Sequence, residues 1–549
     1  MTASQGASRW WRGAVGYEVY LRSFADSDGD GVGDLRGVLE HLDHLAWLGV
    51  DIVWVTPFFP SPMHDHGYDV ADYCGVDPRF GTLADLDALV AAVHARGMRL
   101  LIDLVPNHTS SEHPWFRAAR SSRDNPYRDY YVWRDPAPDG GPPNNWTSHF
   151  GGPAWTFDEA TGQYWLHLFL PEQPDLNWAN PAVADEFDAI LRFWLERGVD
   201  GFRIDVAHAL AKHPDLPDNP PADPADADAD HALTDDFRRL QHIHDVNQPQ
   251  VLDIYRRWRR VVAPYDALLV GEVYVLDAEQ LARYVADDDG LHLAFWFKPL
   301  HMRWSAAAVR EVIADAAAVA PEAIGWVTGS HDRSRAVTRF GGGARGRARA
   351  LVLTTLLACL PGVPFLYQGE ELGLEDGRIP PEAAQDPVAV RAGAHETSRD
   401  AARTPMPWAP GPGLGFTTAA SAWLPFGDRQ PADTVAVQRA DPRSTLHRHR
   451  RLLALRHASD DLRAAPLAWL VEEGPVIAYR RGGTLVVANV GDDRTDVALP
   501  PGRWEVAFAT VAERDGEQVA DALALDGDSA VVLRPAGAEP GPDTTLRRA

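Results

Sequence analysis

The chain has 549 residues, 45% of them hydrophobic and 24% charged, which is the composition of a soluble globular protein. Its 52 basic and 78 acidic residues give a formal net charge of −26. That charge argues against nucleic acid or an anionic membrane as the main partner, because both require a basic surface. The two cysteines, Cys74 and Cys359, exclude a disulfide framework and nearly exclude a metal site built from cysteines.

Eight short apolar runs alternate with helical patterns over most of the chain. The runs are residues 16–21, 51–55, 99–105, 201–205, 267–273, 291–297, 324–328 and 363–367. Helical patterns, such as residues 83–96 and 183–197, lie beside several of them. Alternation of this kind predicts a parallel sheet, and eight repeats predict an α/β fold of the closed (β/α)₈ TIM-barrel type.

Three longer segments interrupt this alternation. Residues 105–177 are rich in Trp, Gly, Pro and Asn and predict a small inserted domain after the third strand. Residues 213–250 contain an acidic, Pro-rich run, for which a solvated loop is favoured over a rim or lid of the active site. Residues 370–441 form a long segment after the last strand, and residues 445–462 have the pattern of a final barrel helix.

The C-terminal part of the chain has a different pattern. From about Leu467 several strand-like runs predict a small antiparallel β domain. The expected domains are a catalytic barrel (1–104 and 178–465), an inserted domain (105–177), a β domain (466–536) and a disordered tail (537–549).

One apolar segment, residues 350–367, is long enough to be considered as a membrane span. Pro361, Gly362 and Pro364 interrupt its second half, so we expect a buried helix that runs into a buried strand. The N-terminal residues lack the apolar run of a secretory signal. We therefore expect a cytoplasmic protein that has no membrane partner.

A glycine-rich loop after the first run carries alternating aspartates. The expected ligands of a calcium ion there are the carboxylates of Asp26, Asp28, Asp30 and Asp34 and the backbone carbonyl of Val32. Gly37 stands where an EF-hand has its bidentate glutamate, so the pattern predicts a structural Ca²⁺ site and not a regulatory one. A turn without metal is the alternative, and no organic cofactor is expected.

Further carboxylates stand where predicted strands end. They are Asp103, Asp205, Glu272 and Asp332, and the residues Arg203, His108 and His331 accompany them. The carboxyl ends of barrel strands converge over one pocket. Carboxylates buried together destabilise the fold and raise one another's pKa values, but glycoside hydrolysis needs such an arrangement, with one nucleophile and one proton donor.

Six motifs have a recognisable form. They are DLVPNH (103–108), GFRIDVAH (201–208), GEV (271–273), SHD (330–332), QPDLN (173–177) and RDAARTPMPW (399–408). The first four resemble the signature regions of the α-amylase family, glycoside hydrolase family 13. The last two resemble its α-glucosidase and oligo-1,6-glucosidase branch. The resemblance extends from Trp11 to about Pro535.

This resemblance implies a role for each matching residue. Asp205 would be the nucleophile, Glu272 the acid and then the base, and Asp332 the carboxylate that binds ring hydroxyls. Arg203, on the same strand face as Asp205, would keep the nucleophile ionised and oriented. The remaining expected sugar contacts are His108, His331, Tyr68 as a stacking ring, and Phe150, for which ordinary packing is the alternative.

Asp65 and Arg403 match residues that pair in the glucosidase branch and close the pocket behind the non-reducing glucose. A closed end allows cleavage only at a chain terminus, so the resemblance implies exo action on short α-glucosides. A surface ion pair of little energetic value is the alternative.

The sequence therefore predicts a retaining exo-α-glucosidase, a monomer or homodimer, that hydrolyses maltose- or isomaltose-type oligosaccharides through a covalent intermediate on Asp205, with possible transglucosylation. Val206 resembles α-1,6-acting relatives, whereas the run Asp205-Val-Ala-His208 resembles α-glucosidases that take maltose, so the linkage stays open. The alternatives are an oligo-1,6-glucosidase and a glucosyltransferase or isomerase that forms trehalose or isomaltulose. A non-catalytic barrel is disfavoured because all three catalytic carboxylates are present.

Overall fold

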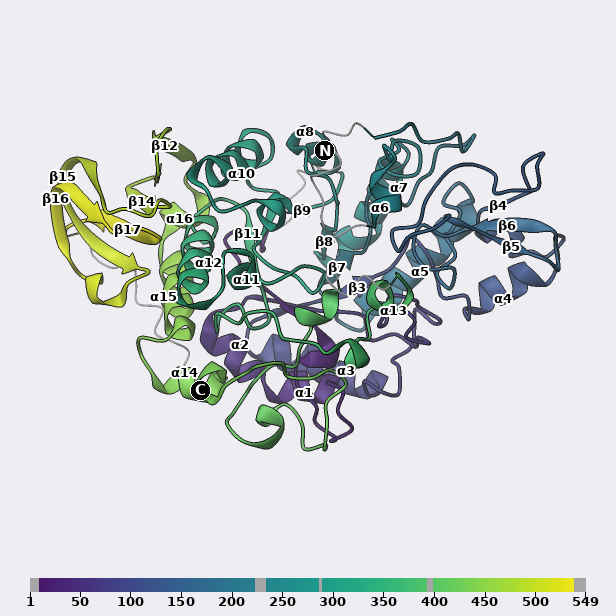
Figure 1. Cartoon of the computed structure of the whole chain (residues 1–549), viewed down its shortest axis with the longest axis horizontal. Coiled ribbons are helices and arrows are strands. Elements are labelled where there is room, and N and C mark those ends of the chain that lie inside the picture. The colour runs from purple at the N-terminus through teal and green to yellow at the C-terminus, as the bar shows by residue number, and fades with distance from the viewer. Residues whose placement is uncertain (1–8, 223–233, 286–288, 393–397, 538–549) are drawn as a thin grey trace.

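Eight parallel strands form a closed barrel at the centre of the computed structural model, which describes residues 9–222, 234–285, 289–392 and 398–537 (Figure 1). The strands are β1 (Gly16–Val19), β2 (Ile52–Val55), β3 (Arg99–Leu104), β7 (Gly201–Ile204), β8 (Leu268–Gly271), β9 (Leu293–Trp296), β10 (Ile324–Val327) and β11 (Val363–Tyr367). Their order around the barrel is β1-β11-β10-β9-β8-β7-β3-β2. All eight predicted strands and the predicted TIM-barrel fold are confirmed.

Both faces of the barrel sheet are buried, as is typical of parallel strands enclosed by helices. Inside the barrel, large side chains such as Trp54, Phe295 and Phe365 fill the core. Gly16 on β1 makes room for one of them, because a Cβ atom there would lie 2.2 Å from the ring of Phe365.

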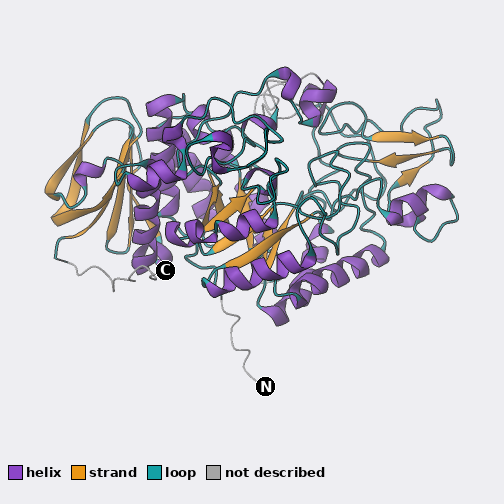
Figure 2. Ribbon diagram, turned by 90° about the horizontal axis from the view of Figure 1, so that it is seen from below, coloured by secondary structure: helices purple, strands orange, loops and turns teal. Residues whose placement is uncertain are grey.

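Helices surround the barrel strands (Figure 2). They include α1 (Leu35–Glu40), α2 (Leu42–Leu48), α3 (Leu83–Ala95), α5 (Pro181–Glu196), α7 (Val251–Val262), α8 (Ala278–Val285), α10 (Ala306–Val319), α12 (Gly343–Ala358) and α15 (Thr445–Ala458). Further helices of the chain are α4 (Pro114–Ser121), α6 (Asp235–Arg238), α9 (Lys298–His301), α11 (Ala336–Arg339), α13 (Pro387–Ala392), α14 (Val435–Ala440) and α16 (Asp460–Ala464).

Local sequence signals fix the starts of these helices. Thr82 and Asp85 form a capping box at the start of α3, and Asn180 caps α5, in which Pro181 is the first residue. The apolar segment considered above forms α12 followed by β11, as predicted. Within the described ranges, no helix is both long and apolar enough to cross a membrane.

A small domain leaves the barrel after β3 and lies at one end of the molecule (Figure 1). It contains α4 and a three-stranded sheet of order β4-β6-β5, made of β4 (Trp133–Arg134), β5 (Trp155–Asp158) and β6 (Gln163–Leu166). Phe116 of α4 stacks on Trp133 at a centroid distance of 5.7 Å, and Trp165 packs against both rings. This aromatic core holds the sheet on the helix.

The C-terminal domain is a six-stranded sheet of order β12-β13-β14-β17-β15-β16 at the opposite end of the molecule (Figure 1). Its strands are β12 (Leu467–Val471), β13 (Val476–Arg481), β14 (Thr484–Asn489), β15 (Thr495–Ala509), β16 (Gln518–Leu525) and β17 (Ser529–Pro535). All pairings are antiparallel, as predicted. The tail predicted to be disordered lies, beyond Gly537, outside the described residues.

Candidate active site

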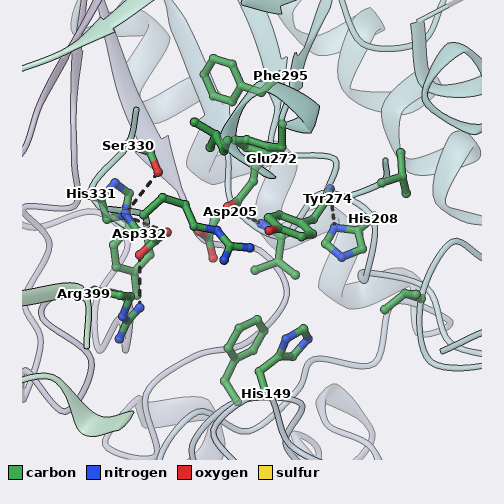
Figure 3. A pocket seen from close by; sticks show the side chains of 18 of the residues that line it. His149, Asp205, His208, Glu272, Tyr274, Phe295, Ser330, His331, Asp332 and Arg399 are labelled. Atoms are coloured by element: carbon green, nitrogen blue, oxygen red, sulfur yellow. Dashed lines mark hydrogen bonds and ion pairs between the residues drawn. The ribbon is translucent and has the colours of Figure 1, made fainter. Parts of the chain in front are cut away.

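A cavity of about 410 Å³ lies where the segments that follow the barrel strands meet. Its polar lining includes Glu18, Asp65, Tyr68, His108, Arg203, Asp205, Glu272, His331, Asp332 and Arg399 (Figure 3). Of the predicted catalytic and sugar-binding residues, only Arg403 does not line it. The β/α alternation therefore brings these side chains together from distant parts of the sequence, at the end of the barrel expected for catalysis.

The Arg203 guanidinium connects three buried carboxylates. Its Nη1 donates to Asp103 Oδ1 at 2.8 Å and to Asp205 Oδ1 at 2.6 Å, and its Nη2 lies 3.0 Å from Glu272 Oε2. Arg203 is 2% exposed, and its guanidinium carbon lies 5.0 Å from the centre of the Trp54 ring. Three acids around one cation retain at least one proton, which is what a nucleophile and acid pair requires.

The pKa values of these carboxyls are raised. Burial raises the pKa of Asp205, and Glu272 and Asp103 raise it further against the opposing effect of Arg203. Burial also raises the pKa of Glu272, with a contribution from Asp332. Asp103 is fully buried, and its pKa is raised to about 6. The protonated form of Glu272 therefore persists to higher pH than that of an exposed glutamate.

The backbone orients Glu272. Val206, directly after Asp205, has a φ of 44°, in the left-handed region that β-branched residues rarely adopt. In this conformation its N–H donates to Glu272 Oε2 at 2.8 Å. Because Oε2 also faces Arg203, Oε1 is the oxygen left to carry a proton. The strain at Val206 is located where it positions the proposed acid.

Asp332 is held as a carboxylate by basic neighbours. Its Oδ1 accepts from Arg403 Nη2 at 2.7 Å and from Arg399 Nη1 at 3.3 Å, and its Oδ2 lies 3.2 Å from His331 Nε2. Burial alone would raise the pKa of Asp332, but these neighbours hold it well below the usual range. The carboxylate remains 34% exposed toward the cavity, so it is available to sugar hydroxyls.

Tyr68 and His331 form one stacked pair beside Asp332. Their rings lie 5.4 Å apart and 9° from parallel, and Tyr68 Oη lies 2.9 Å from His331 Nε2. The other ring nitrogen of His331 contacts the buried carboxylate of Glu18. Burial lowers the pKa of His331 well below its ordinary value. Glu18 was not predicted, since a single acid inside an apolar strand gives no pattern.

His108 is fixed by the QPDLN motif. Gln173 Nε2 lies 3.0 Å from His108 Nε2 and donates to Asp65 Oδ2 at 3.2 Å. Asp175 of the same motif pairs with Lys212 Nζ at 2.6 Å. Burial lowers the pKa of His108 to about 4, so its ring is neutral. The motif thus has a structural explanation, because its Gln173 contacts and positions two residues of the sugar pocket, His108 and Asp65.

The predicted pairing of Asp65 with Arg403 is wrong. Asp65 Oδ1 accepts from Arg399 Nη2 at 2.8 Å, and Arg399 also binds Asp386 at 2.9 Å. Arg403, four residues along the same turn, binds Asp332 and the backbone carbonyl of His331 instead. Because Arg399 is nearer to Asp65, it forms the wall behind the pocket, and Arg403 supports the proposed catalytic carboxylate.

Phe150 of the inserted domain, expected either in the pocket wall or in ordinary packing, lines the cavity. The Arg399 guanidinium carbon lies 5.2 Å from the centre of its ring. Other lining side chains were not predicted from sequence, among them Trp54, Phe169, His149, Phe237 and His242. Within the segment 213–250, most of the acidic run lies outside the described residues, because residues 223–233 are not described. Later in the same segment, Phe237, His242 and Val246 form part of the cavity wall.

The predicted calcium loop follows β1. One carboxylate oxygen from each of Asp26, Asp28 and Asp34 lies within 4.8 Å of the others. Asp30 is outside this group, because its Oδ1 accepts from the N–H of Val32 at 2.7 Å. The three clustered oxygens are hard ligands of the kind that Ca²⁺ prefers.

Comparison with known proteins agrees with this geometry. Residues 18–465 match the family model described as the α-amylase catalytic domain. The chain is 42% identical over 507 residues to a probable α-glucosidase of Rhizobium meliloti (strain 1021), covering 90% of this chain and 92% of the relative. It is 38% identical over 532 residues to an oligo-1,6-glucosidase of Parageobacillus thermoglucosidasius, covering 89% and 92%.

Among solved structures, the chain is similar to the α-glucosyl transfer enzyme XgtA. The TM-score is 0.90 and the sequence identity 41%, and the match covers 96% of this chain and 99% of that one. The similarity therefore includes the barrel, the inserted domain and the C-terminal sheet.

Proposed function

Because the chain belongs to the α-amylase family of glycoside hydrolases, we propose that it is a retaining, exo-acting α-glucosidase. It removes terminal α-linked glucose from maltose- or isomaltose-type oligosaccharides. The observation that carries this proposal is the wall made by Asp65 and Arg399, which closes one end of the cavity next to Asp332. A glucose ring bound against that wall has room for further sugar on one side only.

The reaction proceeds in two displacements at the anomeric carbon. In the first, Asp205 forms a bond to that carbon while the bond to the glycosidic oxygen breaks and Glu272 gives its proton to this oxygen. In the second, Glu272 takes a proton from a water molecule, the oxygen of which replaces Asp205 at the anomeric carbon. Asp205 and Glu272 both contact the guanidinium of Arg203, at 2.6 and 3.0 Å, which supports the short carboxylate separation of a retaining enzyme over the wider one that an inverting reaction needs for its water.

Asp332 and the ring pair of Tyr68 and His331 act on the sugar rather than on the leaving group. An ionised Asp332 accepts hydrogen bonds from ring hydroxyls and stabilises the positive charge that develops on the ring in the transition state. Tyr68 presents its ring beneath the sugar, where it can stack on C–H groups.

Transfer to a second sugar in place of water is the alternative outcome of the same intermediate. The similarity to an α-glucosyl transfer enzyme supports a transferase or disaccharide isomerase as the second candidate. The similarity to an oligo-1,6-glucosidase supports α-1,6 cleavage. Both candidates use the same carboxylates, so only the products separate them.

The test is a time course by NMR with maltose, kojibiose, nigerose, isomaltose, trehalose and sucrose, each at low and high concentration. We expect free glucose from maltose or isomaltose at low concentration, with transfer products only at high concentration. A new disaccharide that accumulates at low concentration with little glucose would reject hydrolysis in favour of transfer.

Further proposals concern the setting of this activity. We propose that a structural Ca²⁺ binds in the loop after β1 through Asp26, Asp28 and Asp34, supported by their all-oxygen cluster. We propose a cytoplasmic location, supported by two free cysteines, the half-buried Cys74 and the buried Cys359, which suit a reducing compartment. The protein acts on small α-glucosides as a monomer or homodimer, which sedimentation analysis distinguishes.

A further inference from the structure

One wall of the cavity is a row of five aromatic rings that begins beside the guanidinium of Arg399. In order, the row comprises Arg399, Phe150, Phe169, His149, Phe237 and His242. The centroid distance is 6.0 Å between Phe150 and Phe169 and falls to 3.6 Å between Phe237 and His242. All six residues line the cavity. The first three rings belong to the inserted domain, and the last two come from the segment after β7.

The two ends of this row face different halves of a bound substrate. Arg399 at one end pairs with Asp65 and closes the glucose pocket. Phe237 and His242 lie at the other end, three and four rings beyond Phe150. Since the glucose occupies the closed end, the far rings face the group that leaves with the glycosidic oxygen, or the acceptor that replaces it. Figure 3 shows His149 across the pocket from Glu272 and Phe295, in keeping with this direction.

Phe237 is held between two imidazole rings. Its ring lies 4.0 Å from that of His149 and 3.6 Å from that of His242, the latter within 8° of parallel. Phe237 is 7% exposed, so its ring is fixed and only part of it faces the cavity. Burial of C–H groups of a leaving sugar, or of an aryl ring, against the exposed edge of Phe237 and its two neighbouring imidazoles contributes to affinity without a hydrogen bond.

His242 is fixed by two hydrogen bonds. Its Nδ1 lies 2.5 Å from Asp245 Oδ2, and its Nε2 lies 2.9 Å from the backbone carbonyl of Phe237. A carbonyl can only accept, so His242 Nε2 donates to the backbone of Phe237, while the fully buried Asp245 holds the other side of the ring. His242 therefore holds both the ring and the backbone of Phe237.

We propose that Phe237 is a specificity-determining residue for the leaving-group and acceptor half of the substrate, and that His242 is the positioning residue that holds it there. This inference rests on the proposed glucosidase activity. It separates two parts of the site: the carboxylates act on the glucose, whereas the far rings bind what the glucose is attached to.

The experiment compares two substrates in the variants Phe237→Ala, Phe237→Leu and His242→Phe. Maltose has a sugar leaving group that reaches the far rings, whereas the fluoride of α-glucosyl fluoride is a single atom that does not. We expect kcat/KM on maltose to fall about 10-fold in Phe237→Ala, mainly through KM, with α-glucosyl fluoride changed less than about 3-fold. Phe237→Leu keeps an apolar side chain, so its kcat/KM on maltose falls less. His242→Phe keeps a ring but neither hydrogen bond, and we expect its kcat/KM on maltose to fall as in Phe237→Ala.

The matched control is His244→Ala, which removes a ring from the same segment that does not line the cavity. We expect this variant to have unchanged kcat/KM on both substrates, and thermal melts show whether each variant is folded. Equal losses on both substrates, or no loss on maltose in folded Phe237→Ala, would overturn the inference. If the unaltered protein cleaves neither substrate, the proposed function is itself wrong, and this inference falls with it.

Discussion

Arg203 couples the protonation of the three carboxyl groups that surround it. A single guanidinium faces Asp103, Asp205 and Glu272, so charge balance is incomplete when all three are ionised. Asp205 and Asp103 share Nη1, while Glu272 faces Nη2 and the N–H of Val206. Glu272 Oε1 lies outside both of these contacts, which suits the proposed role of Glu272 as the acid, whereas Asp205 is the proposed nucleophile.

Removal of the acid and removal of the nucleophile have different consequences. In Glu272→Gln we expect kcat on maltose to fall about 10³-fold or more, because the sugar leaving group needs a proton. On α-glucosyl fluoride the loss is smaller, since fluoride leaves without one. Asp205→Asn loses activity on both substrates. Steady-state rates measure this, and circular dichroism checks folding. Near-normal turnover of maltose in either variant contradicts the assignment.

The same proton sets the pH dependence. Burial raises the pKa of Glu272, so the protonated form persists toward neutral pH and activity falls only as pH rises through that pKa. Asp332, with a lowered pKa, stays ionised and adds no limb near neutral pH. We expect the alkaline limb of kcat/KM on maltose to vanish in Glu272→Gln, measured on its residual activity. A limb that persists there would assign the titration to another group.

Arg399 gives the pocket its closed end. We expect Arg399→Ala to lower kcat/KM on maltose about 10²-fold, since Asp65 and Asp386 are then left without this partner. The control is Arg391→Ala, because Arg391 is 43% exposed and pairs with Glu172. A thermal melt separates lost binding from lost folding. If both variants keep full activity on maltose, the wall has no part in substrate binding.

The sequence motif indicated that an arginine of this turn pairs with Asp65, but it did not indicate which arginine. Arg399 and Arg403 lie four residues apart in one turn. Arg403 is buried, Arg399 is 15% exposed, and both guanidiniums contact acids. Their spacing gives no reason to prefer either as the partner of Asp65. Glu18 shows a related limit, since its importance comes from His331, which is 313 residues away in sequence.

At the scale of elements, the barrel strands were predictable because parallel strands are buried on both faces and read as unbroken apolar runs. β16 was not predicted, because half of its residues are exposed and its pattern is weak. For the segment that carries Phe237, a solvated loop was favoured over a rim of the active site. Its only helix among the described residues, α6, has four residues, too few for a periodic pattern.

The loop after β1 is the element in which bound metal would matter most. Asp34 accepts from Gly37 N–H at 2.7 Å and so caps α1 as well as facing Asp26 and Asp28. We expect a chelator to lower Tm by a few degrees, about 1–2 kcal/mol, and added Ca²⁺ to restore it. Asp28→Asn reduces this response, whereas Asp43→Asn on α2 does not. A Tm indifferent to chelator and Ca²⁺ would reject the site.

At the scale of the molecule, one buried arginine joins the C-terminal sheet to the barrel, and a second supports the same helix end from within the barrel. Arg481 of β13 donates through Nη1 to the carbonyl of Cys359 at 2.6 Å. Arg456 of α15 donates to the carbonyls of Ala358 and Leu360 at 2.7 and 2.9 Å. These carbonyls end α12, where the helix dipole favours positive charge. The sheet therefore stabilises the helix that precedes β11.

This role predicts a loss of stability without a loss of chemistry. Arg481→Met removes a donor from buried carbonyls and should cost about 2–4 kcal/mol of unfolding free energy. The control is Arg480→Met, since Arg480 is the exposed neighbour on the same strand. Urea denaturation measures both, and kcat per folded molecule stays constant. Equal stability of the two variants would show that Arg481 does not brace the helix.

The retaining displacement at Asp205 is the central step of the proposed reaction, and the glucose anomer that is released first reports whether it occurs. The measurement is an NMR time course with p-nitrophenyl α-glucoside, recorded before the glucose anomers equilibrate. We predict that α-glucose appears first and that Asp205→Asn releases none. If β-glucose appears first, or if Asp205→Asn still releases glucose at the normal rate, the covalent intermediate on Asp205 is contradicted.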